Sequence, residues 1–211
     1  MQSIKTIYKI GPGPSSSHTF GPMMASKYIN EQYPEATNFK ITLFGSLALT
    51  GKGHLTDKII LKTLGTSKCE IIFDMKTPVE HPNTMIIEVF DKDTKIAKHT
   101  FVSIGGGKIE IDGKKGNVDP EIYPHTKMDD IQVYCNERHL RLDQYIDEVE
   151  DSDFDSYMNQ IFKQMLKTVN TGLKKTGVLP GSLKIDRVAH ALHQSAQSCS
   201  DIQDKNSLLL S

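Results

Sequence analysis

Hydrophobic residues recur at two different spacings along this chain, and each spacing predicts its own kind of element. In the last third of the chain they recur every three or four positions, as on one face of an amphipathic helix. These positions are Met158, Ile161, Phe162, Met165, Leu166, Val169 and Leu173. Gly177 is expected to end that helix. Further helices are predicted over residues 23–31, 59–64 and 138–149, and from Val188 to Leu192.

An alternation of apolar and polar residues predicts strands in the first two thirds of the chain. Strands are expected over residues 39–44, 69–74, 84–90, 95–104 and 108–112, with a weaker pattern over 128–135 and a short strand or turn over 4–10. The polar residues 91–94 separate two alternating segments, which predicts a β-hairpin. Residues 45–57 are rich in glycine and are predicted to form a loop that leads into the next helix.

Composition and charge narrow the class of protein. The chain has 211 residues, of which 37% are hydrophobic and 24% are charged, so it can bury a core. The net charge of -1 gives no sign of a nucleic-acid partner or of binding to an acidic membrane surface. No apolar run approaches the ~18 residues of a membrane span, and the N-terminus lacks the pattern of a signal peptide.

The cysteines and the last residues add two further expectations. Cys69, Cys135 and Cys199 lie far apart and form neither a disulfide framework nor a CxxC pair. A reducing cytoplasm is therefore the expected location. The run from Ser207 to Ser211 is apolar and ends without a helix cap, so we expect helical sequence to continue beyond it.

The most distinctive segment is the loop from Gly11 to Pro22. It combines two Gly-Pro pairs, which restrict the backbone path, with side chains that can donate or accept a proton. These are Ser15, Ser16, Ser17, His18 and Thr19. A hydroxyl-rich loop before a helix suits an anionic group such as a substrate carboxylate. The alternative is an N-cap cluster in a surface turn.

Three shorter elements also carry candidate chemistry. Within Gly51–Asp57, His54 is either a general base beside close backbone or a surface histidine in a turn. His81 and Asn83 flank a proline, which favours a simple turn. The glycines of Ser103–Gly107 suit either an anion cradle or a strand-end bulge. The other histidines show no metal-ligand spacing, so no zinc site is predicted.

All four elements lie beside turns within the first ~110 residues, which is typical of a pocket built by loops on a sheet. The residues themselves thus indicate a small-anion or amino-acid site with histidine and hydroxyl groups. They do not specify a reaction.

The order of these motifs resembles the beta domain of the bacterial-type iron-sulfur L-serine dehydratases. The resemblance rests on Gly11–Pro22, Gly45–Asp57, His81–Met85 and Ser103–Gly107 together. The segment from about Tyr157, including Gly177–Lys184, resembles the start of that family's alpha domain. The resemblance implies a beta-type domain over residues 1–150 and a truncated alpha domain over 151–211, separated by the acidic stretch at 148–153.

The resemblance also implies an activity, which is conversion of L-serine to pyruvate and ammonia without pyridoxal phosphate. It implies a [4Fe-4S] cluster that acts as a Lewis acid, held by cysteines beyond Ser211. Under this hypothesis His54 is the base and His18 the second candidate for proton transfer. Substrate binding is assigned to Ser15, Ser16, Ser17, Thr19, His81 and Asn83. The 211 residues alone are expected to bind no cluster and to be inactive.

The fold implied by the resemblance is α+β, with a mixed β-sheet, helices packed on one face and a C-terminal helical segment. The partners implied are L-serine, the rest of the alpha domain and a second copy in a homodimer. Two other classes of function stay open from the sequence. One is a non-catalytic domain that senses a small anion or an amino acid. The other is a dimerisation module built on the helix from Met158 to Leu173.

Overall fold

The computed structural model describes residues 1–116, 119–179, 184–199 and 203. Its contacts divide the chain into two compact units. One unit holds residues 11–116 and carries the sheet. The other is helical and holds residues 1–10 together with 119–179 and 185–199. The domain boundary expected at residue 150 stays a prediction, because a compact unit need not coincide with a domain of the family.

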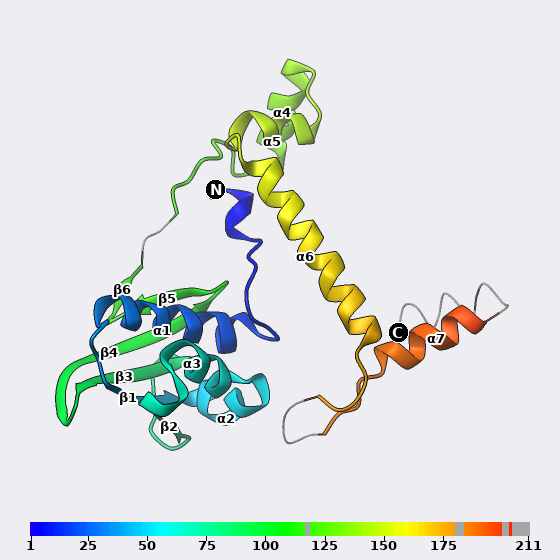
Figure 1. The fold of residues 1–211 in the computed structure, drawn as a ribbon. Coiled ribbons are helices and arrows are strands. Elements are labelled where there is room, and N and C mark those ends of the chain that lie inside the picture. The colour runs from blue at the N-terminus through cyan, green and yellow to red at the C-terminus, as the bar shows by residue number, and fades with distance from the viewer. Residues whose placement is uncertain (117–118, 180–183, 200–202, 204–211) are drawn as a thin grey trace. The chain divides into compact units, whose positions relative to one another are not determined.

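A six-stranded sheet organises the first unit (Figure 1). Its strands are β1 (Asn38–Phe44), β2 (Cys69–Asp74), β3 (Thr84–Asp91), β4 (Thr94–Gly105), β5 (Lys108–Ile111) and β6 (Lys114–Lys115). The spatial order is β2-β1-β3-β4-β5-β6. β1 pairs parallel with β2 and every other pair is antiparallel. The expected hairpin is confirmed as β3 and β4.

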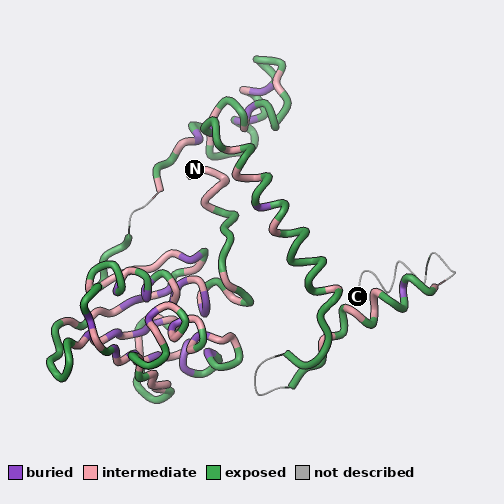
Figure 2. Tube along the Cα trace, in the orientation of Figure 1, coloured by how far each residue is buried: buried purple, intermediate pink, exposed green. Residues whose placement is uncertain are grey.

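One face of the sheet carries the core, because the buried residues of neighbouring strands lie opposite each other. Ile41 pairs with Ile71 of β2 and with Ile87 of β3, and Met85 of β3 pairs with Phe101 of β4. Ile41, Ile87 and Phe101 are fully buried. Figure 2 shows buried residues along these strands. The period-two pattern in the sequence therefore marks this face correctly.

Three helices cover that face: α1 (Gly21–Gln32), α2 (Gly45–His54) and α3 (Thr56–Leu64). α1 packs against β4 and β5, while α2 packs against β1, β2 and β3 and α3 against β2 (Figure 1). The helices α2 and α3 also form the crossover that a parallel β1–β2 pair requires. The α+β fold with a mixed sheet is thus confirmed.

The glycine-rich segment 45–54 was expected to be a loop, and this was wrong because it is the helix α2. Leu47 and Ala48 are buried against the sheet, and such burial outweighs the cost of ~1 kcal/mol for each helical glycine. Gly51 also faces α3, since a Cβ atom there would lie 3.2 Å from Thr56 Oγ1. The left-handed backbone of Leu55 (φ 63°) then separates α2 from α3.

The helical unit contains α4 (Met128–Arg138), α5 (Leu142–Val149), α6 (Phe154–Lys174) and α7 (Ala189–Ser198). The strand expected over 128–135 was wrong, because this segment begins α4. Ile131 and Cys135 lie one helical turn apart and pack with Tyr123 and Tyr145, and aspartates occupy the first turn of α4, where they favour a helix. The apolar run 207–211 lies outside the described residues.

The N-terminal residues belong to the helical unit and form a 3₁₀ turn at Ile4–Thr6. Glu150 binds them, because its carboxylate accepts hydrogen bonds from Ser3 Oγ (2.6 Å) and from the Ile4 backbone N–H (2.8 Å). The Tyr123 hydroxyl donates to the same carboxylate at 2.7 Å. Burial, followed by this hydrogen bond, raises the pKa of Tyr123 above its ordinary range.

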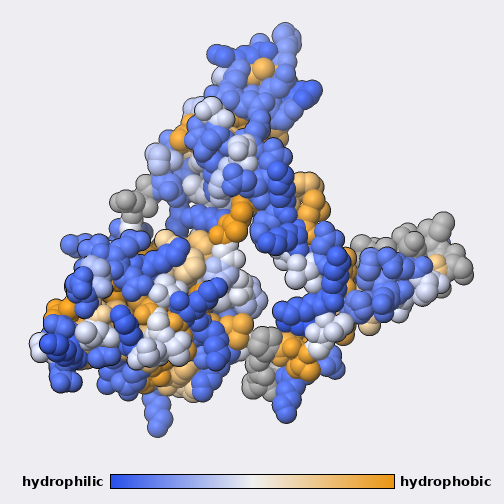
Figure 3. All heavy atoms as spheres, in the orientation of Figure 1, coloured by the Kyte–Doolittle hydropathy of each residue, from blue (hydrophilic) through white to orange (hydrophobic). Residues whose placement is uncertain are grey.

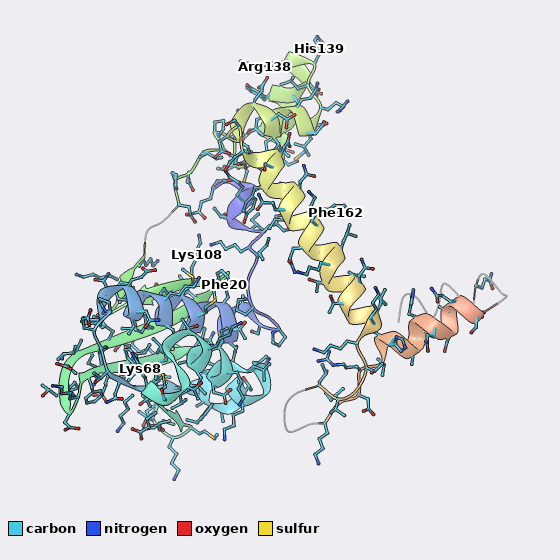
Figure 4. All side chains as sticks on the ribbon, in the orientation of Figure 1. Phe20, Lys68, Lys108, Arg138, His139 and Phe162 are labelled. Carbon is cyan, nitrogen blue, oxygen red and sulfur yellow. The ribbon has the colours of Figure 1, made fainter. Side chains whose placement is uncertain are left out.

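The amphipathic pattern of α6 is confirmed as a helix, which ends at Lys174, three residues before the expected Gly177. Ile161 is buried, but Phe162, Met165 and Val169 on the apolar face are exposed. Figure 3 shows hydrophobic atoms beside this helix, and Figure 4 shows Phe162 pointing away from it. Within the described residues no helix is long and apolar enough to cross a membrane.

We predict that Gly45→Ala destabilises the protein by about 2 kcal/mol or more. Gly45 has φ +50°, and a Cβ atom there would lie 2.6 Å from the backbone oxygen of Pro82. The Pro82 oxygen belongs to the backbone and cannot rotate away as a side chain could. The junction between β1 and α2 would therefore have to shift. Urea unfolding of the purified chain measures the effect.

Gly53→Ala in the same helix is the matched control. No heavy atom lies within 4 Å of its Cβ position, so alanine should raise stability by up to about 1 kcal/mol. Equal effects of the two substitutions would contradict the close approach of Gly45 to Pro82.

Candidate functional site

The loop before α1 is folded tightly by its own polar groups. The Thr19 side chain is almost fully buried, and its hydroxyl lies 2.6 Å from the carbonyl oxygens of Pro12 and Ser15. Residues Ser16–Phe20 form a π-helical turn, in which the Gly21 N–H donates to Ser16 O. Such turns occur frequently at functional sites. The turn brings the side chains of the loop around the ring of His18.

Phe20 anchors this loop to the β4–β5 connection. Its ring lies between two glycines, since Cβ atoms on Gly11 and Gly107 would lie 1.9 and 1.8 Å from ring carbons. Figure 4 labels Phe20 and the neighbouring Lys108. The glycines therefore allow a close approach that no other residue type permits. Contact with Phe20 therefore explains why both positions are glycine, and no bound anion is needed to explain them.

The Nδ1 side of the His18 ring faces serine hydroxyls. Ser17 Oγ lies 3.0 Å and Ser15 Oγ lies 3.3 Å from His18 Nδ1. Ser16, the third serine of the motif, is exposed. The structure thus brings Ser15 and Ser17 to the ring of His18 and leaves Ser16 at the surface.

The Nε2 side of the ring faces α2. Thr50 Oγ1 lies 3.0 Å, Ser46 Oγ 3.1 Å and Ser46 O 3.3 Å from His18 Nε2. Ser46 and Thr50 are not among the residues predicted from the sequence. Ser46, Thr50 and His54 follow one another at intervals of four residues and so share a helix face, but this spacing has no meaning in the loop that the glycines predict.

His54 ends α2 and lies against His18. The two ring centroids are 4.6 Å apart, with 36° between the ring planes. His54 Nδ1 lies 3.1 Å from the Thr50 carbonyl oxygen. The buried Thr56 hydroxyl donates to the His18 carbonyl oxygen at 2.7 Å and so joins α3 to the loop. The two candidate proton-transfer residues are therefore neighbours.

The loop with His81 and Asn83 hydrogen-bonds to the start of α2, not to the two histidine rings. The Ser46 N–H donates to Pro82 O at 2.7 Å, which joins the loop to the start of α2. The Asn83 N–H donates to His81 Nδ1 (3.1 Å), and Asn83 Nδ2 donates to Ser103 O (3.4 Å). Asn83 Oδ1 and Ser103 Oγ are buried, with no hydrogen-bond partner among the described residues.

The glycine run that follows Ser103 forms a strand-end irregularity. The register of β4 against β5 shifts between Ser103 and Gly105, which is the bulge that the sequence left open. A separate surface hollow of about 440 Å³ lies at the starts of β1 and β2, lined in part by Lys40, Lys68 and Glu70. It is at the opposite ends of these strands from the histidines.

Burial favours the uncharged form of His18. The residue is 7% exposed, and this burial, followed by the charge of His54 when protonated, lowers the pKa of His18 below its ordinary value of 6.5. The carbonyl oxygen of Ser46 opposes the shift. Among the described residues neither His18 nor His54 contacts a carboxylate, so the group offers imidazole nitrogens and hydroxyls for proton transfer and hydrogen bonding.

The three cysteines of this chain lie in or beside separate elements. Cys69 lies in β2, where burial raises the pKa of its thiol to about 11 and so disfavours the thiolate that binds iron. Cys135 is buried in α4, and Cys199 follows α7. Across the described part of the chain, no group of three His, Cys, Asp or Glu side chains could hold a metal ion.

Comparisons with known proteins identify the family. The model of the serine dehydratase beta chain family matches residues 3–72. L-serine dehydratase 2 of Escherichia coli is 30% identical over 97% of this chain and 55% of its own length. L-serine dehydratase of Helicobacter pylori strain J99 is 31% identical over 89% and 52%. The chain belongs to the L-serine dehydratase family.

The match extends to a relative from another organism. L-serine dehydratase of Haemophilus influenzae is 27% identical over 97% of this chain and 56% of its own length. The chain therefore spans about half the length of the curated relatives it matches. The beta-chain model covers the loop of His18, the helix α2, the strand β1 and most of β2, so the matched residues include both His18 and His54.

We predict that His54→Gln raises the pKa of His18, because it removes a neighbouring charge. The pKa should stay below 6.5, since burial is the larger cause of its lowering. A pH titration of the histidine ring signals by NMR measures both values. An unchanged pKa of His18 would contradict the contact between the two rings.

The lowered pKa of His18 makes the stability of the fold depend on pH. Because the pKa of His18 is lower in the folded than in the unfolded chain, the unfolded chain takes up this proton first as the pH falls. The contribution of His18 to stability is therefore present above pH 6.5 and lost as the pH falls through the folded-state pKa. A His18→Gln variant should show a weaker loss of stability over that range in urea unfolding.

Proposed function

We propose that this chain is the N-terminal part of an enzyme that converts L-serine to pyruvate and ammonia, with His54 as the base. The observation that carries the proposal is the contact of His18 and His54, with ring centroids 4.6 Å apart and hydroxyl groups on two sides of the His18 ring. The names of the relatives support the same reaction. Serine and threonine are both compatible, because one methyl group changes selectivity by only ~1–3 kcal/mol.

The contacts of His54 suit a base. The Thr50 carbonyl oxygen can only accept, so His54 Nδ1 carries a proton and donates it at 3.1 Å. In the neutral ring the Nε2 atom then holds a free lone pair. In the proposed reaction Nε2 takes the α-proton of L-serine, and the imidazolium so formed returns a proton to the departing β-hydroxyl group, which leaves as water. The aminoacrylate formed tautomerises to an imine, and water hydrolyses the imine to pyruvate and ammonia.

The other candidate residues are proposed to share the proton transfer or to bind the substrate. His18 is the second candidate for proton transfer or substrate orientation. Ser15, Ser16, Ser17, Thr19, His81 and Asn83 are proposed to bind the carboxylate or the amino group. Ser17 and Ser15 have contacts to His18 that support such a role, whereas the hydroxyl of Thr19 contacts the carbonyl oxygens of its own loop.

The rest of the proposal concerns the complete enzyme. Its [4Fe-4S] cluster rests on the resemblance alone, since the described residues of this chain offer no ligand set for it. We propose that the cluster ligands and the other half of the active site lie in the rest of the alpha domain. The enzyme is further proposed to act as a homodimer in the cytoplasm, in serine catabolism.

Turnover of L-serine by the full-length gene product tests the role of His54. With anaerobic purification and a pyruvate assay, His54→Gln should lower kcat by 10²–10⁴-fold, which is the usual contribution of a general base. His139→Asn is the matched control, because His139 is exposed in the other unit and has a left-handed backbone that asparagine tolerates. It should retain wild-type turnover.

Three results would count against the proposal. Normal turnover by His54→Gln would remove His54 from the chemistry. Absence of pyruvate from the wild-type enzyme with an intact cluster would point to another substrate. Absence of both cluster and turnover, with L-serine still bound, would favour a sensing domain.

We also predict that the 211-residue chain alone assembles no stoichiometric cluster and releases no pyruvate. The reason is that its three cysteines lie in separate elements and that the Cys69 thiol resists ionisation. Ultraviolet-visible absorption after anaerobic reconstitution measures cluster assembly. A stoichiometric cluster on this chain would contradict the prediction.

A further inference from the structure

We propose that Thr50 positions both imidazoles of the site and holds them in opposite tautomers. Its side-chain hydroxyl sets the ring of His18, and its backbone carbonyl sets the ring of His54. The consequence for catalysis rests on the proposed function, whereas the tautomers follow from the contacts alone.

The His18 side of the argument begins with the hydroxyl of Thr50. This hydroxyl donates its hydrogen to Ser46 O at 2.9 Å, one helical turn earlier in α2. Having used its only hydrogen there, Thr50 Oγ1 can only accept from His18 Nε2, which lies 3.0 Å away. Ser46 O, another atom that only accepts, lies 3.3 Å from the same nitrogen. The Ser46 hydroxyl, 3.1 Å from this nitrogen, can accept as well as donate. With two neighbours that only accept, neutral His18 is assigned its proton on Nε2.

The other nitrogen of His18 must then accept. Its Nδ1 atom lies 3.0 Å from Ser17 Oγ and 3.3 Å from Ser15 Oγ, and both hydroxyls can donate. Both nitrogens thus have partners of the correct type for one tautomer. The lone pair of His18 is directed at the serine loop.

His54 has the reverse arrangement. Thr50 O lies 3.1 Å from His54 Nδ1 and requires a proton on that nitrogen. Neutral His54 therefore has its lone pair on Nε2. The Nδ1–H form is the minor tautomer of a free histidine side chain, so the carbonyl contact must select it. Thr50 thus sets the tautomer of His18 through its hydroxyl oxygen and the tautomer of His54 through its carbonyl oxygen.

The chain offers a matched control for the hydroxyl of Thr50. Thr63 in α3 makes the same kind of bond, since its hydroxyl donates to Ile59 O at 2.8 Å, also one turn earlier. Thr63→Val and Thr50→Val therefore remove equivalent helix hydrogen bonds. Only Thr50→Val removes an acceptor from an imidazole.

The experiment records ¹⁵N shifts of the histidine side chains by NMR in the 211-residue chain, at about pH 8, where an ordinary histidine is neutral. His18→Gln and His54→Gln assign the signals. The wild-type chain should show His18 protonated on Nε2 and His54 protonated on Nδ1. Thr50→Val should lower the Nε2–H to Nδ1–H ratio of His18 about fivefold, as for one lost hydrogen bond. Its carbonyl remains, so the signals of His54 should not change.

Thr50→Ser restores the hydroxyl and should return His18 to the wild-type signals, while Thr63→Val should leave both rings unchanged. In the full-length enzyme Thr50→Val should lower kcat about tenfold with little change in KM, because a misdirected ring affects the chemical step more than binding. Thr50→Ser should recover most of this loss.

The outcomes separate the two proposals. Opposite tautomers that respond to Thr50→Val, in an enzyme that makes no pyruvate, would support the positioning role and overturn the proposed function. Pyruvate formation with His18 signals that ignore Thr50→Val would overturn the positioning role and leave the function intact. A wild-type His54 protonated on Nε2 would also overturn the positioning role.

Discussion

The site depends on how α2 is held against the sheet. Leu47 and Ala48 are buried beneath it, and the Ser46 N–H bonds to Pro82 O at 2.7 Å. These contacts fix the rotation of the helix about its axis. Because side chains four residues apart lie on one helix face, the row of Ser46, Thr50 and His54 is then presented to His18. A rotation of α2 would separate the two histidines without breaking the helix itself.

The two histidines lie in contact, and neither bonds to a carboxylate among the described residues. Burial lowers the pKa of His18, and hydroxyl and carbonyl oxygens satisfy its ring nitrogens. Such oxygens orient a neutral ring but stabilise its charged form less than a carboxylate does. The arrangement therefore suits a ring that stays neutral beside a base, rather than a preformed ion pair.

His99, in the same unit, differs from His18 and His54 because it bonds to a carboxylate. His99 Nδ1 lies 2.7 Å from Asp112 Oδ2, and His99 Nε2 lies 2.8 Å from the Tyr33 hydroxyl. Its backbone pairs with that of Ile87 on the face beneath α1, and its ring packs on Tyr28 and Phe101. His99 thus joins α1 to the sheet, and it illustrates why residue type alone does not separate structural from functional histidines.

The sequence by itself determined the strands β1 to β5, the hairpin, the amphipathic helix α6 and the membership of the motif residues in one family. Alternation and helical spacing are local properties of the sequence, so they can be recognised without knowledge of the packing. Only the tertiary structure decided that residues 45–54 form a helix and that residues 128–138 form another. In both segments burial against distant residues outweighs local preference. For the same reason the sequence named His18 and His54, while only the packing of α2 revealed Ser46 and Thr50 between them.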